Sequence, residues 1–224
     1  MSEEPAVPIS PPPAKSFSWL DVWMNALAFP SVATFEEIVN DPKATIERAC
    51  IWVLLATVIS QVISIFAPLA LAKMLGSASS GASTSIIATS LDSIGFPAAL
   101  SVVLLLIVAR IDQIIENGLG GDGTYLKAVY AFGAYLAPLI LIEGVLRSIP
   151  IINPLFLILF LIAYGLVLNV IAVKAVHHIG WGKAIIPSMT LMVIAGVMAK
   201  MIEVVIIASL PLLVFLDKLA NSSW

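Results

Sequence analysis

Charged residues are scarce in this chain of 224 residues. Asp, Glu, Lys and Arg make up 11% of it and hydrophobic residues 60%, whereas a soluble domain carries about 25% charged residues. A water-soluble fold of this length buries only part of its surface, so it could not hide so many apolar side chains. Lipid can take up that surface. The composition therefore predicts an all-α, polytopic integral membrane protein.

Basic charge and cysteine are also sparse. The formal net charge of −3 does not indicate a nucleic-acid partner. A single cysteine, Cys50, excludes an internal disulfide, and we interpret it as a small buried hydrophobe, with palmitoylation as the alternative. The N-terminus lacks the basic start and apolar core of a signal peptide, so we expect the first membrane span to direct targeting.

Catalytic motifs are missing as well. There is no Ser-His-Asp set, HExxH motif or pair of catalytic acids, so we expect no enzymatic activity, no cofactor and no metal. Residues 118–123 fit GxGxxG literally, but no strand precedes them, and we interpret the glycines as a sharp turn. Lys183 is followed by Ala184 instead of the Ser or Thr of a phosphate loop. Adjacent His177 and His178 lack metal-ligand spacing.

Long uncharged stretches are what the chain does have. Residues 49–72 lie uncharged between Arg48 and Lys73 and match the length of about 20 residues that a membrane span needs. The same pattern predicts four further spans, at about 95–115, 126–146, 151–173 and 186–210. Because charges interrupt the last stretch, a shorter span followed by a separate terminal piece is the alternative.

The distribution of Lys and Arg predicts the orientation, because cytoplasmic loops are enriched in both. With five spans, one side holds Lys15, Lys43, Arg48, Arg110, Lys127, Lys174 and Lys183, and the other holds Lys73, Arg147 and Lys218. We therefore expect a cytoplasmic N-terminus and an extracytoplasmic C-terminus.

The N-terminal 47 residues divide into two parts. Residues 1–16 are rich in proline and predict a disordered tail. Residues 17–47 predict a cytoplasmic amphipathic segment, in which residues 17–29 form a helix that begins with the Ser18–Asp21 pair. We interpret Trp19 and Trp23 as anchors in the membrane interface, with a helix packed on the membrane domain as an equal alternative.

A second short helix follows in this amphipathic segment. Thr34 with Glu37 resembles a capping box, and the helix is expected to stop before Pro42. The expected membrane domain then covers residues 48–215, and residues 216–224 form a C-terminal tail.

Several charges lie within or beside the spans. Lys200 and Glu203 are spaced to pair on one helix face. They are either part of a proton or ion path, a neutralised pair that holds helix packing, or a pair lifted to the outer membrane interface. We interpret Asp112 and Glu116, with Arg110, as a solvated helix end at the headgroups, and cation binding by the two acids is the alternative.

Two further spacings concern contacts. Gly133 and Ala137 form a small-xxx-small pair that allows close helix packing, and Glu143 and Arg147 form an i,i+4 pair. A lipid-phosphate contact by Lys174, His177 and Lys183 is a further hypothesis for the turn that follows the fourth span.

The order of several short motifs resembles the YIP membrane protein family, named for binding Ypt/Rab GTPases, and in particular its prokaryotic branch. The resemblance covers residues 25–210. The residues that carry it are Phe29-Pro30, Thr34 to Glu37, Asp41-Pro42, Gly120 to Tyr125, Val129 to Pro138, Tyr164 to Leu168, Ala172 to His177 and Gly182 to Ala184.

The resemblance implies five spans, a cytoplasmic N-terminus, no catalytic activity and a prokaryotic cell membrane as the location. GTPase binding is implied by family analogy alone, and eukaryotic members act in vesicle traffic between the ER and the Golgi. We place the candidate interaction residues in the two predicted cytoplasmic turns. They are Gly120, Gly121, Gly123, Tyr125, Trp181, Gly182 and Lys183.

The leading hypothesis is a non-enzymatic membrane scaffold that contacts lipid, other membrane proteins or further copies of itself. The alternative is a small transporter or channel that uses Lys200 and Glu203 with Tyr164 or Asn169. A third hypothesis, a protein that organises or curves the membrane, depends on the tryptophan-bearing segment 17–29.

Overall fold

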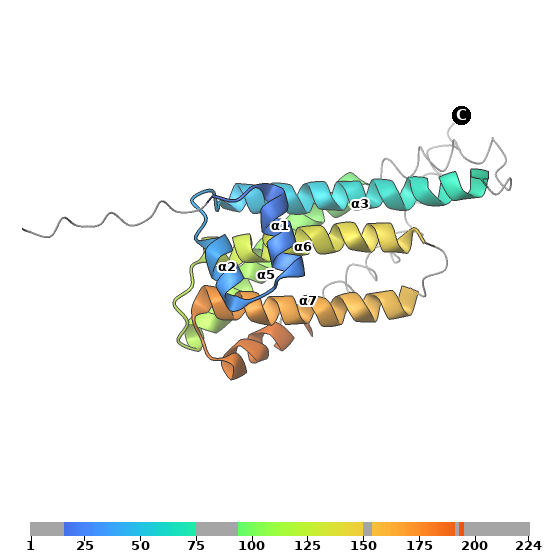
Figure 1. The fold of residues 1–224 in the computed structure, drawn as a ribbon. Helices are drawn as coiled ribbons and strands as arrows, with labels where there is room; N and C mark the ends of the chain where they lie inside the picture. Colours follow the sequence, from blue (N-terminus) through green and yellow to red (C-terminus); the bar gives the residue numbers. More distant parts are fainter. Residues whose placement is uncertain (1–15, 75–93, 150–153, 191–192, 195–224) are drawn as a thin grey trace, which may run out of the picture.

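The computed structural model describes residues 16–74, 94–149, 154–190 and 193–194. All regular structure in these ranges is helical. The helices shown in Figure 1 are α1 (Trp19–Ala28), α2 (Val32–Val39), α3 (Ile46–Met74), α5 (Gly95–Gly118), α6 (Tyr125–Arg147) and α7 (Pro154–His177). Residues 181–190 form a further helix.

Helix α1 begins at a capping box, as the sequence predicts. The Ser18 hydroxyl accepts a hydrogen bond from the Asp21 N–H at 3.2 Å, and the Asp21 carboxylate accepts one from the Ser18 N–H at 3.1 Å. Two N–H groups that would otherwise lack partners are thereby satisfied. The helix ends at Ala28, two residues before Pro30.

Helix α2 begins earlier than the sequence predicts. Its N-cap is Ser31, whose hydroxyl accepts from the Thr34 N–H at 3.0 Å, so the capping box assigned to Thr34 and Glu37 is wrong. Ser31 directly precedes the first helical residue, from where its hydroxyl reaches an unpaired N–H of the first turn. The Thr34 hydroxyl donates instead to the Phe29 carbonyl at 3.0 Å.

Four helices of the described residues are long and apolar enough to cross a membrane. The candidate spans are Ile46–Ala67, Gly95–Gly118, Tyr125–Arg147 and Leu159–His177. They coincide with the first four spans predicted from the sequence. The fifth predicted span starts within the helix at 181–190 and includes the helical residues 193–194. Its other residues, including Lys200 and Glu203, lie outside the described residues.

Helix α6 is the centre of the bundle. Of its span, 56% is buried, whereas the other three spans are 22–28% buried. A Cβ added at Gly133 would lie 2.8 Å from the Cβ of Ala49, and one added at Gly144 would lie 2.8 Å from the Cα of Ser60. Small residues therefore bring α6 and α3 close together, as the small-xxx-small spacing at Gly133 predicts.

The short helices gather at one end of the long ones. Helices α3, α6 and α7 lie side by side, α2 sits at one end of them, and α1 lies across them near that end (Figure 1). Helix α1 contacts α6, and α2 contacts both α6 and α7. We call this end of the bundle the α2 end.

Candidate interaction site at the α2 end of the bundle

Two turns that are far apart in the sequence meet at the α2 end. The first joins α5 to α6 and the second joins α7 to the helix at 181–190. Asp122 Oδ1 lies 2.8 Å from His178 Nδ1, the Lys183 ammonium donates to the Leu119 carbonyl at 2.9 Å, and the Asp122 N–H donates to the His177 carbonyl at 3.4 Å. The candidate residues of both turns therefore form one surface.

Glycines allow the first turn to lie directly on His177. A Cβ at Gly123 would lie 2.6 Å from Nδ1 of His177, and one at Gly121 would lie 2.9 Å from its Cβ. Gly120 has a φ of +89°, which a residue with a side chain rarely adopts. The structural interpretation of the GxGxxG match as a sharp turn agrees with this geometry.

Beneath the turn lies a buried polar cluster of Asp112, Glu116 and His177. All three are at most 1% exposed, so the interpretation of the two acids as a solvated helix end is wrong. The glycine turn folds back onto the end of α5, where the Gly121 N–H donates to the Glu116 carbonyl at 2.9 Å. His177 Nε2 lies 3.5 Å from Asp112 Oδ2, and the side-chain polar atoms of all three residues have no hydrogen-bond partner within the described chain.

The cluster bears on two sequence hypotheses about ions. Among the described residues, no group of three His, Cys, Asp or Glu side chains has the arrangement that holds a metal ion. That finding does not test cation binding by Asp112 and Glu116 alone, because two acids are not such a group. A lipid-phosphate contact by the His177 side chain is excluded, because that side chain is buried. Of its two expected partners in that contact, Lys174 donates to the Ile179 carbonyl at 3.3 Å, and Lys183 is bonded across to the first turn.

The Asp122–His178 contact at the surface is different in character. Both side chains are exposed, at 74% and 54%. The hydrogen bond from the His178 imidazole holds the pKa of the Asp122 carboxyl below its usual range. Because the carboxylate is the form that accepts this bond, the contact is complete above the ordinary Asp pKa and is lost as the pH falls through the lowered value.

The remaining candidate residues flank the two turns. The Tyr125 hydroxyl donates to the Leu106 carbonyl at 3.1 Å, and the Arg110 guanidinium lies 5.8 Å from the Tyr125 ring centroid. Trp181 is 52% exposed, with the Lys174 ammonium 5.1 Å from its ring. Gly182 has open space where a side chain would be. Trp181 therefore presents a half-exposed apolar ring beside the Lys174 ammonium.

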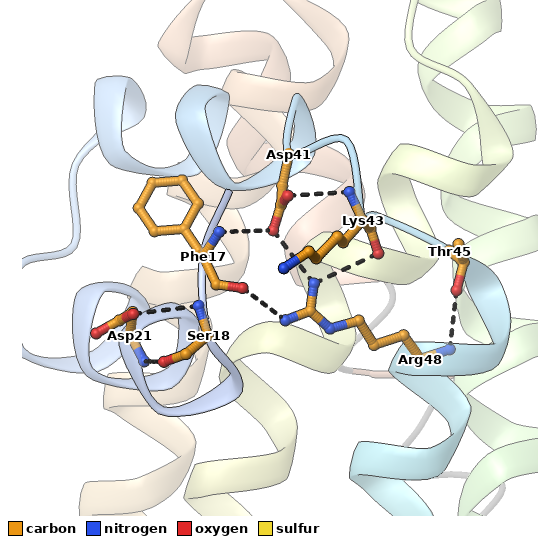
Figure 2. A network of polar contacts seen from close by, with 7 residues as sticks. All are labelled: Phe17, Ser18, Asp21, Asp41, Lys43, Thr45 and Arg48. Carbon is orange, nitrogen blue, oxygen red and sulfur yellow. Dashed lines mark hydrogen bonds and ion pairs between the residues drawn. The ribbon is translucent and has the colours of Figure 1, made fainter. Parts of the chain in front are cut away.

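A second polar network, which we call the Arg48 clamp, ties the N-terminal segment to the first span. It consists of the Asp41 and Arg48 side chains and the backbones of Phe17 and Lys43 (Figure 2). Arg48 donates to Asp41 at 3.2 Å and to the Phe17 carbonyl at 2.9 Å. Asp41 also accepts from the N–H groups of Phe17 at 3.3 Å and Lys43 at 2.9 Å.

The clamp is buried. The Asp41 side chain is fully buried and that of Arg48 is 10% exposed, so each charge depends on the other for compensation. The sequence analysis missed this pair. The sequence signal was that Asp41 lies seven residues before Arg48. Because a turn separates the two residues, this spacing does not predict how close their side chains lie.

Aromatic packing completes the attachment of α1. Trp52 is fully buried, and the rings of Trp19 and Trp23 meet it edge-on with centroids 6.0 Å and 6.2 Å away. The Arg48 guanidinium lies 4.9 Å from the Trp52 ring centroid. These contacts support a helix packed on the membrane domain, while Trp19 keeps 42% of its surface exposed.

The proposed partners of Lys200 and Glu203 are engaged elsewhere. The Tyr164 hydroxyl donates to the Leu27 carbonyl, and the Tyr135 hydroxyl donates to Asn169 Oδ1 at 3.3 Å. Tyr164 thus fastens the end of α1 to α7.

Fold and site together define the class, which is an integral membrane protein of long apolar helices. At the α2 end, helices α1 and α2 and the two paired turns form a surface that we call the platform. The family model for the Yip1 domain matches residues 24–202. The chain belongs to the Yip1 family, which confirms the resemblance found in the sequence. No curated protein and no solved structure matches the chain.

Proposed function

We propose that this Yip1-domain protein is a non-enzymatic membrane scaffold whose α2 end is the surface that contacts other membrane proteins or further copies of the chain. The Arg48 clamp carries the proposal. It holds two short helices in place on the bundle, although isolated helices shorter than about 12 residues are marginal in water. Burying the charges of Asp41 and Arg48 costs solvation free energy. This cost favours a role at the surface for the segment that the pair attaches, which carries α1 and α2.

The outward side of α1 supports a place in the membrane interface. Trp19, Leu20, Met24 and Phe29 are 42–69% exposed, and α1 lies across the long helices instead of along them (Figure 1). Apolar and tryptophan side chains on such a helix favour the boundary between headgroups and acyl chains. We infer that α1 anchors the platform at that depth.

The topology that we infer for the scaffold has five spans, with the N-terminus in the cytoplasm of a prokaryotic cell. The α2 end would then face the cytoplasm, where Lys and Arg are enriched. A GTPase partner rests on family analogy alone.

Site-specific photo-cross-linking in intact membranes tests the scaffold role. A photoreactive residue at Trp181, which is 52% exposed, samples the α2 end, and one at Val103, which is 49% exposed, samples the flank of α5. We expect distinct protein adducts from position 181, identified by mass spectrometry, with differently tagged copies revealing self-association.

Two outcomes would contradict the proposal. Lipid adducts alone from both positions would reject a scaffold role. Protein adducts from position 103 alone would reject the α2 end as the contact surface. Flux of ions through liposomes that hold the purified chain would favour the transport alternative.

A further inference from the structure

The buried cluster of Asp112, Glu116 and His177 has no part in the function proposed above. Asp112 and Glu116 lie one turn apart on α5, and His177 is the last residue of α7, with its Nε2 atom 3.5 Å from Asp112 Oδ2. All six side-chain oxygen and nitrogen atoms of the cluster are buried, and none has a hydrogen-bond partner within the described residues. Because buried polar groups of native proteins are nearly always satisfied, these atoms point to a bound ligand.

We propose that the ligand is the proton, and that Asp112, Glu116 and His177 form a proton-binding site that holds the glycine turn on the end of α7 while two protons are bound. With a neutral imidazole and two ionised carboxylates the cluster is doubly negative, so two protons make it neutral. The three groups share these protons as one coupled site. The proposal is independent of the scaffold role, since it concerns how the two turns pair and not what contacts them.

The cost of burying charge favours the protonated form. Buried ionisable groups either pair with a charge of opposite sign or become neutral. Glu116 lies in the last turn of α5, where the helix dipole disfavours an anion, whereas His177 ends α7, where the dipole favours a cation. A protonated imidazole beside the Asp112 carboxylate, with a neutral Glu116, meets both conditions. Protonation also supplies the hydrogen-bond donors that two ionised acids lack.

The charged groups around the cluster leave this compensation to His177. Tyr135 of α6 interacts electrostatically with Asp112, and Asp122 of the glycine turn interacts with His177 but is itself bonded to His178. The cations of the neighbouring elements all donate to other groups. They are Arg48 of α3, Arg110 of α5, Lys174 of α7 and Lys183 of the helix at 181–190, bonded to Asp41, Gln113, the Ile179 carbonyl and the Leu119 carbonyl.

The glycine turn is bonded to both helix ends that carry the cluster. The Gly121 N–H donates to the Glu116 carbonyl at 2.9 Å, and the Asp122 N–H donates to the His177 carbonyl at 3.4 Å. A Cβ at Gly123 would lie 2.6 Å from Nδ1 of His177. The packing of the turn therefore depends on the position of the His177 ring, which the charge state of the cluster sets.

Counting protons gives the sign of the pH dependence. When the turn opens and water reaches the cluster near pH 7, both acids lose their protons and the imidazole is mostly neutral. The open turn thus binds about two protons fewer than the closed turn, so rising pH favours opening. The opening equilibrium constant should rise by up to about a hundredfold per pH unit, or about tenfold for each linked proton.

Hydrogen exchange of the full chain in liposomes tests this linkage. The Gly121 and Asp122 amides report opening of the turn, after correction for the intrinsic pH dependence of exchange. We expect the wild-type opening constant to rise at least about tenfold per pH unit above neutral. Asp112→Asn combined with Glu116→Gln needs no protons for neutrality and should abolish this rise, whereas Glu47→Gln, at an exposed acid, should keep it. A flat wild-type profile, or the same slope in the double variant, would overturn the proposal.

Infrared spectroscopy supplies an independent readout that the wild-type chain alone can give. We expect the carbonyl band of a protonated carboxylic acid near neutral pH, lost at high pH over the range in which the turn opens, and absent from Glu116→Gln. If no such band is present near neutral pH, the cluster does not hold the protons and the proposal is wrong. Closure of the turn at high pH by added Ca²⁺ would identify a metal ion as the ligand and would also contradict it.

Discussion

At Gly133, the close packing of α6 against α3 depends on the absence of a Cβ atom. The space that a Cβ would need there is already taken by the side chain and backbone of Ala49 on α3. Close packing of this kind resists enlargement, since neither helix backbone can yield without disturbing its other contacts.

Gly133→Ala should therefore destabilise the protein, by about 1–3 kcal/mol of overpacking, partly offset by about 0.5–1 kcal/mol of gained helix propensity. Gly165→Ala is the matched control, because its new Cβ would meet only Leu139, at an ordinary 3.7 Å. Thermal unfolding in detergent should show a lower midpoint for the first variant and an unchanged or higher one for the second. Equal midpoints would mean that α3 and α6 can move apart freely.

At the scale of elements, α1 and α2 illustrate how short helices become stable by attachment. They have 10 and 8 residues, and each starts at a serine N-cap. The caps decide where each helix begins, but tertiary contacts provide most helical stability in proteins. Here those contacts are the Arg48 clamp and the aromatic packing on Trp52.

Arg48→Met should release this pair of helices from the bundle. Removal of one partner from a buried ion pair costs about 3–5 kcal/mol, because the other charge stays buried without compensation. We expect faster hydrogen exchange in α1 and easier proteolysis between residues 29 and 45 in liposomes. Arg110→Met is the control at an exposed arginine and should leave both unchanged. The addition of Asp41→Asn to Arg48→Met should restore part of the protection, and if Arg48→Met alone has no effect, the clamp does not hold the platform.

At the scale of the whole molecule, the bundle is asymmetric from end to end. Both paired turns, the two short helices and the buried cluster of Asp112, Glu116 and His177 lie at the α2 end. Basic residues of the described chain are enriched there too, which is the charge asymmetry that sets orientation in a membrane.

Reporter tags at the two termini should therefore report opposite compartments, with the N-terminal tag cytoplasmic. An odd number of spans requires this, and the Lys and Arg distribution decides which end stays inside. Protease protection of each tag in sealed membranes is the measurement. Tags in one compartment would exclude five spans.

Much of the architecture followed from the sequence alone. The four described spans and the start of α1 could be predicted because hydrophobic length and N-cap chemistry are local properties that neighbouring residues decide. The start of α2 was misplaced because Ser31 and Thr34 both have side chains that suit an N-cap. The structure places Ser31 in the extended conformation of an N-cap and Thr34 inside the helix.

The tertiary structure decided what lies between distant residues. The burial of Asp112 and Glu116 depends on His177 and the glycine turn, and the clamp joins Arg48 to a carbonyl 31 residues away. Hydropathy averages a window of neighbours, so it marks these side chains as charged without indicating which other element covers them. The sequence by itself thus determines which segments can span a membrane, because the length and apolar composition of a single helix decide this. The tertiary structure decides the candidate site, because its contacts form only when separate helices pack together.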